Sequence, residues 1–423
     1  MFLETEDKLR QTVWEVVHRT PIFDIHTHIY DARFGDLLLW GIDEVLTYHY
    51  LVAEVFRYDP MDQQHFYEHL DYQKFYAMPK RKQADLIWAK VFLEHSPVSE
   101  AARGVLTTLG LLGMDPRDRN LNLYREYFEA KTAEEHINTV FHVANIEGVI
   151  MTNDPFDDKE RSVWESGQVG DKRFHAALRL DGLLNNWGEA HAILKSWGYN
   201  VKDKLDKTTV AEVNRFLNEW IDRMDPLYMA VSLPPTFDAF DKSDRAKLIH
   251  KCILPVSRDR HRPFAMMIGV KKLTNPGLAV AGDSVGKATI EVVERLCLEN
   301  QKNKFLVTML SRENQHELCI AARKFNNLLP FGCWWYLNDP MTIDEMTRMR
   351  LELLGLSFIP QHSDARVLDQ LLYKWAHSRW LIALVLQDKY SDLHRTGWRV
   401  TETEIERDVS YLFGGAFKHF LGA

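Results

Sequence analysis

Short apolar runs of strand length alternate with longer helical segments along most of this 423-residue chain. The runs are apolar throughout, which is typical of strands buried on both faces of a parallel sheet. Segments 209–224, 287–299, 314–325 and 341–354 separate several of the runs and have the length and spacing of helices. Eight strands followed by helices predict an α/β fold in which the sheet closes into a distorted (β/α)8 TIM barrel. The predicted strands are residues 21–28, 148–152, 174–180, 227–233, 263–270, 304–310, 329–335 and 356–361.

One long segment interrupts this alternation. Residues 31–145, after the first strand, have a helical pattern without a clear strand. We expect them to form a mostly helical insertion that covers the mouth of the barrel. Helical patterns also occupy residues 4–19 and the tail from Asp369 to the end. Residues 1–423 contain no repeat or low-complexity linker and are therefore predicted to form one domain.

Composition excludes several classes of protein. The net charge of −8 argues against a nucleic-acid-binding surface. No run of about eighteen apolar residues suggests a membrane span, and the acidic start is unlike a signal peptide, so a cytoplasmic protein is expected. Aromatic residues in the tail favour a homo-oligomer. The cysteines lack metal-site spacing and are predicted to be buried reduced thiols; they are Cys252, Cys297, Cys319 and Cys333.

A His-x-His pair ends the first predicted strand. His26 and His28 lie on the same face of a strand, because side chains alternate between faces. Both imidazoles can therefore reach one divalent ion, unless the two histidines are simply packed or exposed. A second apolar run that ends in polar residues, including His362 and Asp364, lies over residues 358–366. First and last strands are neighbours in a closed sheet, so we expect the two strand ends to meet.

Other polar and aromatic residues follow the predicted strands, at the face where such barrels carry their active sites. Arg179, Arg312 and Arg366 could bind a carboxylate bidentately or pair with loop carboxylates. Of Trp334 and Trp335, one is expected to pack in the core and the other, Trp335, to wall the pocket.

A His-Tyr pair lies in the predicted insertion. His49 and Tyr50 could belong to an aromatic helix face. If the insertion covers the barrel mouth, they could instead deliver a proton donor to a substrate.

In combination these motifs resemble the uronate isomerases (glucuronate isomerases), an outlying branch of the amidohydrolase superfamily. The resemblance implies one divalent metal ion, with zinc expected, and a small uronic acid substrate. It implies interconversion of D-glucuronate with D-fructuronate and of D-galacturonate with D-tagaturonate. It also implies that His26, His28 and Asp364 bind the metal and that Asp364 moves a proton. By the same resemblance, His49, Tyr50 and Arg366 contact the reacting sugar and Arg179 binds substrate. Arg312 and Trp335 join the predicted substrate site by their positions after strands.

One position departs from the family pattern. Many members have a histidine on the fifth strand, where this chain has Met267, a poor ligand for a borderline ion. We therefore expect three protein ligands. Two alternatives stay open: a metal-dependent hydrolase of the same superfamily acting on a small acidic substrate, and a non-catalytic binding protein for acidic sugars. The missing histidine argues against the hydrolase, and the proton-handling residues argue against the binding protein.

Overall fold

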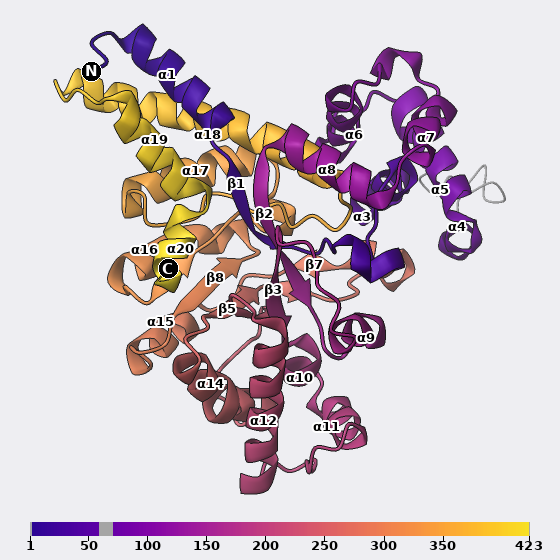
Figure 1. The fold of residues 1–423 in the computed structure, drawn as a ribbon, viewed down its shortest axis with the longest axis vertical. Coiled ribbons are helices and arrows are strands. Elements are labelled where there is room, and N and C mark those ends of the chain that lie inside the picture. The colour runs from indigo at the N-terminus through magenta and orange to yellow at the C-terminus, as the bar shows by residue number, and fades with distance from the viewer. Residues whose placement is uncertain (1, 59–70, 423) are drawn as a thin grey trace.

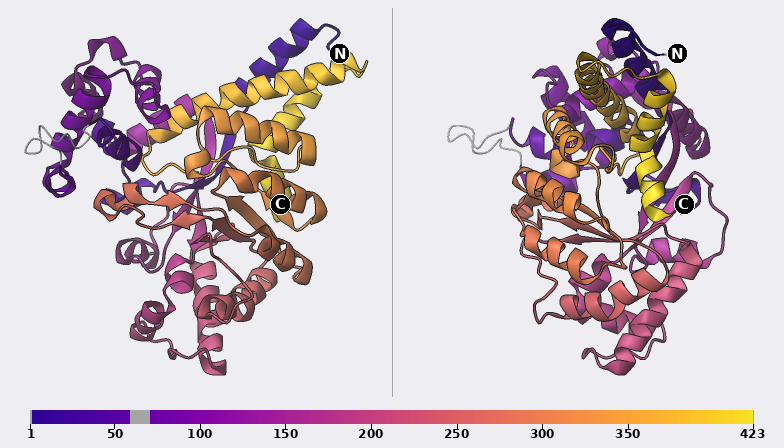
Figure 2. Two further views of the ribbon diagram at one scale, coloured as in Figure 1. Left: turned by 180° about the vertical axis from the view of Figure 1, so that it is seen from behind. Right: turned by 90° about the vertical axis from the view of Figure 1, so that its left-hand side faces the viewer.

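A parallel β-sheet forms the centre of the molecule. The computed structural model describes residues 2–58 and 71–422. Seven strands lie side by side in their order along the chain, each parallel to its neighbours, and the sheet is curled (Figures 1 and 2). Each of these strands overlaps a predicted one, although predicted strand 329–335 is a strand only at residues 329–330. The seven strands are β1 (Ile22–Thr27), β2 (Ile146–Asn153), β3 (Phe174–Arg179), β4 (Met229–Leu233), β5 (Phe264–Ile268), β8 (Phe305–Met309) and β9 (Leu328–Pro330).

Both faces of this sheet are buried, which explains why its strands are apolar throughout. On β5, Phe264 and Met266 belong to the cluster that packs under the surrounding helices. Their neighbours Ala265 and Met267 belong to a different cluster on the opposite face. That second cluster receives side chains from every strand of the sheet: Ile25, Ile150, Ala177, Ala230, Ala265, Met267, Leu306 and Leu329.

Helices connect the successive strands on the outside of the sheet (Figure 1). The four helices predicted after residue 200 are present. Three of them, at residues 209–224, 287–299 and 314–325, contribute apolar residues to the cluster that packs on the sheet, as amphipathic helices should, whereas the helix at 341–354 packs mainly on its neighbouring helices. The connecting helices include α9 (Asp158–Glu165), α12 (Lys207–Met224), α13 (Asp244–Leu248), α14 (Leu254–Asp259), α15 (Ile290–Glu299), α16 (Gln315–Lys324) and α17 (Pro340–Leu354).

The segment after β1 is helical in its described parts and forms a lobe beside the sheet (Figure 1). Residues 59–70 of the predicted insertion lie outside the described residues. The lobe has a core of its own, which includes Leu46, Val55, Val91 and Val105. Its α-helices are α2 (Ile42–Leu46), α3 (His49–Val55), α4 (Tyr72–Ala77), α5 (Lys80–Ile87), α6 (Glu100–Leu111) and α7 (Leu121–Glu129). The last helix of the segment, α8 (Ala133–Ala144), packs against α18 (Gln370–Arg395) and β2.

The last predicted strand, residues 356–361, is not a regular strand. Ile359 forms an isolated parallel bridge with Phe331. Pro330 and Pro360 lack the N–H groups that a ladder needs, so regular pairing stops here. Residues beyond Pro360 nevertheless reach the far edge of the sheet, where Asp364 N donates to His26 O at 3.2 Å and His28 N donates to Ala365 O at 2.7 Å.

The two ends of the chain pack together. Helix α1 (Glu6–Arg19) lies along α18 (Gln370–Arg395), the long helix of the tail (Figure 2). The buried Arg379 of α18 donates to the carbonyl oxygens of Val17 and Thr20 at 2.6 and 2.7 Å, which satisfies the end of α1. The four cysteines are buried and unbridged, as predicted. Among the described helices, none has the length and apolar character needed to cross a membrane.

Candidate active site

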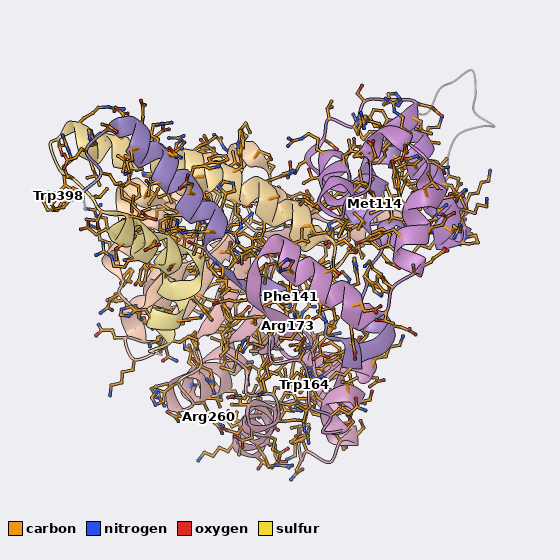
Figure 3. The ribbon with its side chains drawn as sticks, turned by 45° about the horizontal axis from the view of Figure 1, so that its top comes forward. Met114, Phe141, Trp164, Arg173, Arg260 and Trp398 are labelled. Carbon is orange, nitrogen blue, oxygen red and sulfur yellow. The ribbon has the colours of Figure 1, made fainter. Side chains whose placement is uncertain are left out.

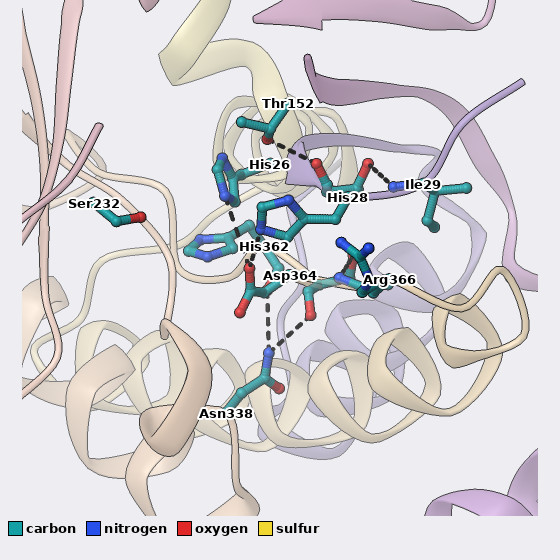
Figure 4. Close-up of polar contacts among 12 residues, drawn as sticks. His26, His28, Ile29, Thr152, Ser232, Asn338, His362, Asp364 and Arg366 are labelled. Carbon is teal, nitrogen blue, oxygen red and sulfur yellow. Dashed lines mark hydrogen bonds and ion pairs between the residues drawn. The ribbon is translucent and has the colours of Figure 1, made fainter. Parts of the chain in front are cut away.

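Three side chains from opposite ends of the chain meet at the carboxyl end of β1. Oδ1 of Asp364 lies 3.7 Å from Nε2 of His26 and 3.5 Å from Nε2 of His28 (Figure 4). The ligand atoms of the three residues all lie within 4.8 Å of one another. His26 Nε2 and Asp364 Oδ1 are buried and have no hydrogen-bond partner among the described residues. Two imidazoles and a carboxylate with unused lone pairs are a donor set that fits a divalent ion.

The backbone around Asp364 is held from β1. The φ angle of Asp364 is 51°, in the left-handed region that Asp and Asn tolerate better than most residues. Ser363 N donates to both carboxylate oxygens of Asp24 at 3.1 and 3.2 Å, and Trp375 Nε1 donates to Asp24 Oδ2 at 2.8 Å. Burial raises the pKa of Asp24 to about 6, against the effect of these hydrogen bonds. Asp24 therefore anchors the segment that presents Asp364.

A buried tyrosine orients His26. The hydroxyl of Tyr228, just before β4, donates to Ile25 O at 2.8 Å and lies 2.9 Å from His26 Nδ1. Because the hydroxyl proton is used toward Ile25, we assign the proton of His26 to Nδ1, which donates to the Tyr228 oxygen. This tautomer leaves the Nε2 lone pair directed at Asp364. Such support is typical of metal-binding histidines.

Charges around the cluster favour ionised Asp364 and neutral histidines. Burial alone would raise the pKa of Asp364, but the nearby imidazoles of His28 and His26, when protonated, and the charge of Lys374 outweigh burial and lower it. Burial, as the largest cause, lowers the pKa of His26 and of His28. These protonation states are the ones that metal ligands need.

The predicted His-Tyr pair borders a cavity of about 310 Å³. His49 and Tyr50 begin helix α3, and Trp335 reaches the same cavity from the segment after β9. His49 Nε2, Tyr50 Oη and Trp335 Nε1 are buried and find no hydrogen-bond partner in the described part of the chain. Burial lowers the pKa of His49 to about 3, with a smaller contribution from the charge of Lys374. The cavity therefore presents neutral hydrogen-bonding groups that a polar ligand could satisfy.

Two of the three predicted arginines lie near the cluster. Arg179 ends β3, where its Nε lies 3.0 Å from Oδ2 of Asp181, and its charge acts on the pKa values of His26 and His28. Arg366 is exposed beside Asp364 (Figure 4).

Arg312 has a different partner. Its side chain is 59% exposed and donates to both carboxylate oxygens of Glu345 at 2.8 and 2.9 Å. Arg312 was predicted to lie with the other two arginines, and the structure corrects this prediction. Its guanidinium group already binds the carboxylate of Glu345 at the surface.

The structure adds residues that sequence reasoning missed. Asp24 shares the alternation of His26 and His28, and this period could have identified it. Tyr228 and Lys374 carry no such signal, because only the fold brings them to the cluster. Met267 is buried in the interior cluster, and the metal-binding group contains no ligand from β5 among the described residues.

Comparison with solved structures identifies the family. A uronate isomerase from Bacillus halodurans matches with a TM-score of 0.96 and 56% identity, over 99% of this chain and 97% of that chain. A uronate isomerase from Thermotoga maritima (TM-score 0.75, 15% identity, 100% of both chains) and a glucuronate isomerase from Caulobacter crescentus (0.73, 15%, 98% of this chain and 94% of that chain) show the same fold. No protein-family model and no curated protein matches the chain. Because more than half of the residues are identical to those of the Bacillus enzyme over almost the whole length, this chain belongs to the uronate isomerase family.

Proposed function

We propose that this enzyme interconverts D-glucuronate with D-fructuronate and D-galacturonate with D-tagaturonate. The observation that carries the proposal is the 56% identity to a uronate isomerase over 99% of the chain. Two further observations support it: His26, His28 and Asp364 converge, and the cavity that His49, Tyr50 and Trp335 line carries polar groups without a hydrogen-bond partner among the described residues. The hydrolase alternative is less well supported, because no such match favours it.

We propose that residues 358–365 complete a distorted (β/α)8 barrel as an irregular eighth strand. Gly332 N donates to Ile359 O at 2.8 Å on the β9 side, and the hydrogen bonds between residues 364–365 and β1 lie on the other side. In this arrangement residues 1–423 form one domain, and residues 31–145 cover the barrel mouth. The position of His49 and Tyr50 in one cavity with Trp335 supports that covering role.

The proposed metal ligands are His26, His28 and Asp364, and zinc is the proposed ion. Neutral imidazoles and a carboxylate suit zinc. When bound, the ion supplies positive charge that polarises substrate oxygens and stabilises negative charge on them.

The reaction transfers a proton from C2 to C1 through an enediol and moves a second proton between the two oxygens. We assign Asp364 as the base at C2, because its surroundings favour the ionised carboxylate and none of the described residues donates a hydrogen bond to Oδ1. Tyr50 or His49 donates to the carbonyl oxygen. Arg366 stabilises the enediolate, Arg179 binds the substrate carboxylate, and Trp335 forms a wall of the pocket.

Proton NMR tests this function directly. Purified protein is incubated in D₂O with D-glucuronate or D-galacturonate, with and without a chelator. Appearance of the ketouronate is the expected result, and loss of turnover in chelator is expected if the ion takes part. If folded, metal-loaded protein changes neither sugar, the proposal is wrong, and lactones and amides become the substrates to screen for hydrolysis.

Tyr228→Phe is expected to weaken zinc binding by about 10- to 100-fold, because outer hydrogen bonds to ligating histidines typically have this effect. The substitution keeps the ring but removes the hydroxyl that fixes the His26 tautomer. Competition with a chromogenic chelator measures the affinity. Tyr390→Phe is the matched control, since Tyr390 is also buried but donates to Asp408, at 2.8 Å. Equal zinc affinities of the two variants would refute this role of Tyr228.

We also propose a homo-oligomer. In the tail, Trp380 and Trp398 are 51% and 64% exposed, and Trp398 lies at the outer end of the helical tail (Figure 3). Exposed large aromatic side chains are common at subunit interfaces. Light scattering after size exclusion should give a multiple of 49.4 kDa; a monomer at micromolar concentration would contradict the proposal.

A further inference from the structure

Lys374 is a buried lysine with unused hydrogen-bonding capacity. It lies in the first turns of α18 and is 2% exposed. Its Nζ donates to Ser363 O at 2.6 Å, the one hydrogen bond that this ammonium makes to the described residues. An ammonium has three N–H donors, and leaving donors unsatisfied in a buried place is unfavourable. The remaining donors therefore have room for a ligand oxygen.

The surroundings of Lys374 bring this donor close to several residues of the proposed site. The side chain lines the same cavity of about 310 Å³ as His49 and Tyr50. Nζ lies 5.6 Å from the centre of the Tyr50 ring, and the carbonyl that it binds belongs to the residue before Asp364. Lys374 thus lies close to the proposed proton donor and is hydrogen-bonded to the residue before the proposed base.

Lys374 differs in charge from the other ionisable residues that line this cavity. Of the described residues that line it, Lys374 is the one lysine or arginine, whereas Glu54, Glu100 and Asp339 contribute carboxylates. None of these carboxylates forms an ion pair with Nζ within the described part of the chain. A buried cation without a contact ion pair is costly for stability, and such groups concentrate at functional sites.

We propose that Lys374 is a catalytic residue that donates a hydrogen bond to the substrate oxygen on which negative charge develops in the enediolate. No covalent bond to the lysine forms or breaks, and its ammonium remains protonated throughout. The inference rests on the proposed isomerase function and assigns a further residue to the same site. Removal of one such donor typically lowers kcat by about 10²- to 10³-fold.

Lys374 could instead have a structural role, in which it holds the Ser363 carbonyl in place. A second residue that binds the same carbonyl allows this role to be tested. Asn338 Nδ2 donates to the same carbonyl oxygen at 3.1 Å. If Lys374 acted by fixing this carbonyl, Asn338→Ala would cause a loss of similar size.

The test compares wild type, Lys374→Met and Asn338→Ala, each loaded with zinc, in the ketouronate assay. Lys374→Met is expected to lower kcat about 10²- to 10³-fold with KM within about threefold, and with unchanged zinc content and thermal midpoint; Asn338→Ala is expected to lose less than about tenfold. If Lys374→Met does not fold, Lys374→Gln replaces it. In Lys374→Ala, added propylammonium is expected to restore turnover in a saturable manner.

The outcomes separate this inference from the proposed function. If wild type turns over uronates and Lys374→Met keeps kcat within about threefold, the inference is overturned and the function stands. A loss in Asn338→Ala as large as that in Lys374→Met also overturns it, in favour of the structural role. If wild type converts neither uronate, both the function and the inference fail.

Discussion

Asp364→Asn should lower kcat by about 10³-fold or more while leaving the fold intact. The amide cannot accept the C2 proton, and general base catalysis alone typically contributes about 10²- to 10⁴-fold. Asparagine has the same shape as aspartate and also tolerates a φ of 51°, so it is a better choice than alanine, which would add backbone strain. The ketouronate assay at saturating zinc measures kcat, and circular dichroism monitors the fold.

Two controls distinguish the role of Asp364 as a base from its role as a metal ligand. Zinc content is measured in the same samples, because the amide is also a weaker ligand, and turnover is compared at equal occupancy. Asp388→Asn changes a carboxylate that pairs with Arg10 and Arg348 on the surface, and it should keep normal turnover. Near-normal kcat in the fully loaded Asp364→Asn enzyme would remove Asp364 from the chemistry.

Gly332→Ala is expected to destabilise the fold by about 3 kcal/mol or more. Gly332 has a φ of 62°, and a Cβ placed there would lie 1.7 Å from Nδ1 of His362. The His362 ring is fully buried, so it has little space to move away. The cost combines a left-handed alanine with overpacking, each about 1 to 3 kcal/mol. Denaturant titration measures the free energy of unfolding.

Gly355→Ala is the matched control. Gly355 has almost the same φ, 61°, but no atom lies within 4 Å of its hypothetical Cβ. It should lose only the backbone term of about 1 to 2 kcal/mol. Because His362 lies next to His26, with ring centres 5.3 Å apart, Gly332→Ala should also lower turnover, whereas Gly355→Ala should not. Equal free energies of unfolding for the two variants would show that the His362 ring can yield.

Seven strands were predictable because a parallel sheet buried on both faces requires continuous apolar runs. Such runs can be recognised from neighbouring residues in the sequence alone. The eighth was not, since the apolar content of residues 356–361 is that of a strand, but Pro330 and Pro360 interrupt the hydrogen bonds on either side of the contact. The hydrophobicity of residues 356–361 indicated a strand, but whether this segment pairs regularly with its neighbours depends on which backbone N–H groups are available.

The sequence by itself determined that His26 and His28 share a face, because the two-residue period of a strand is local geometry. It also carried enough likeness to a known family to indicate Asp364 as their partner. Only the tertiary structure decided that Tyr228 sets the His26 tautomer, that Lys374 enters the cavity, and that Arg312 binds Glu345 instead of joining the site. Those contacts depend on how elements far apart in the sequence pack together and on which side chains then come within hydrogen-bond distance. The local periodicity of the sequence does not encode that packing.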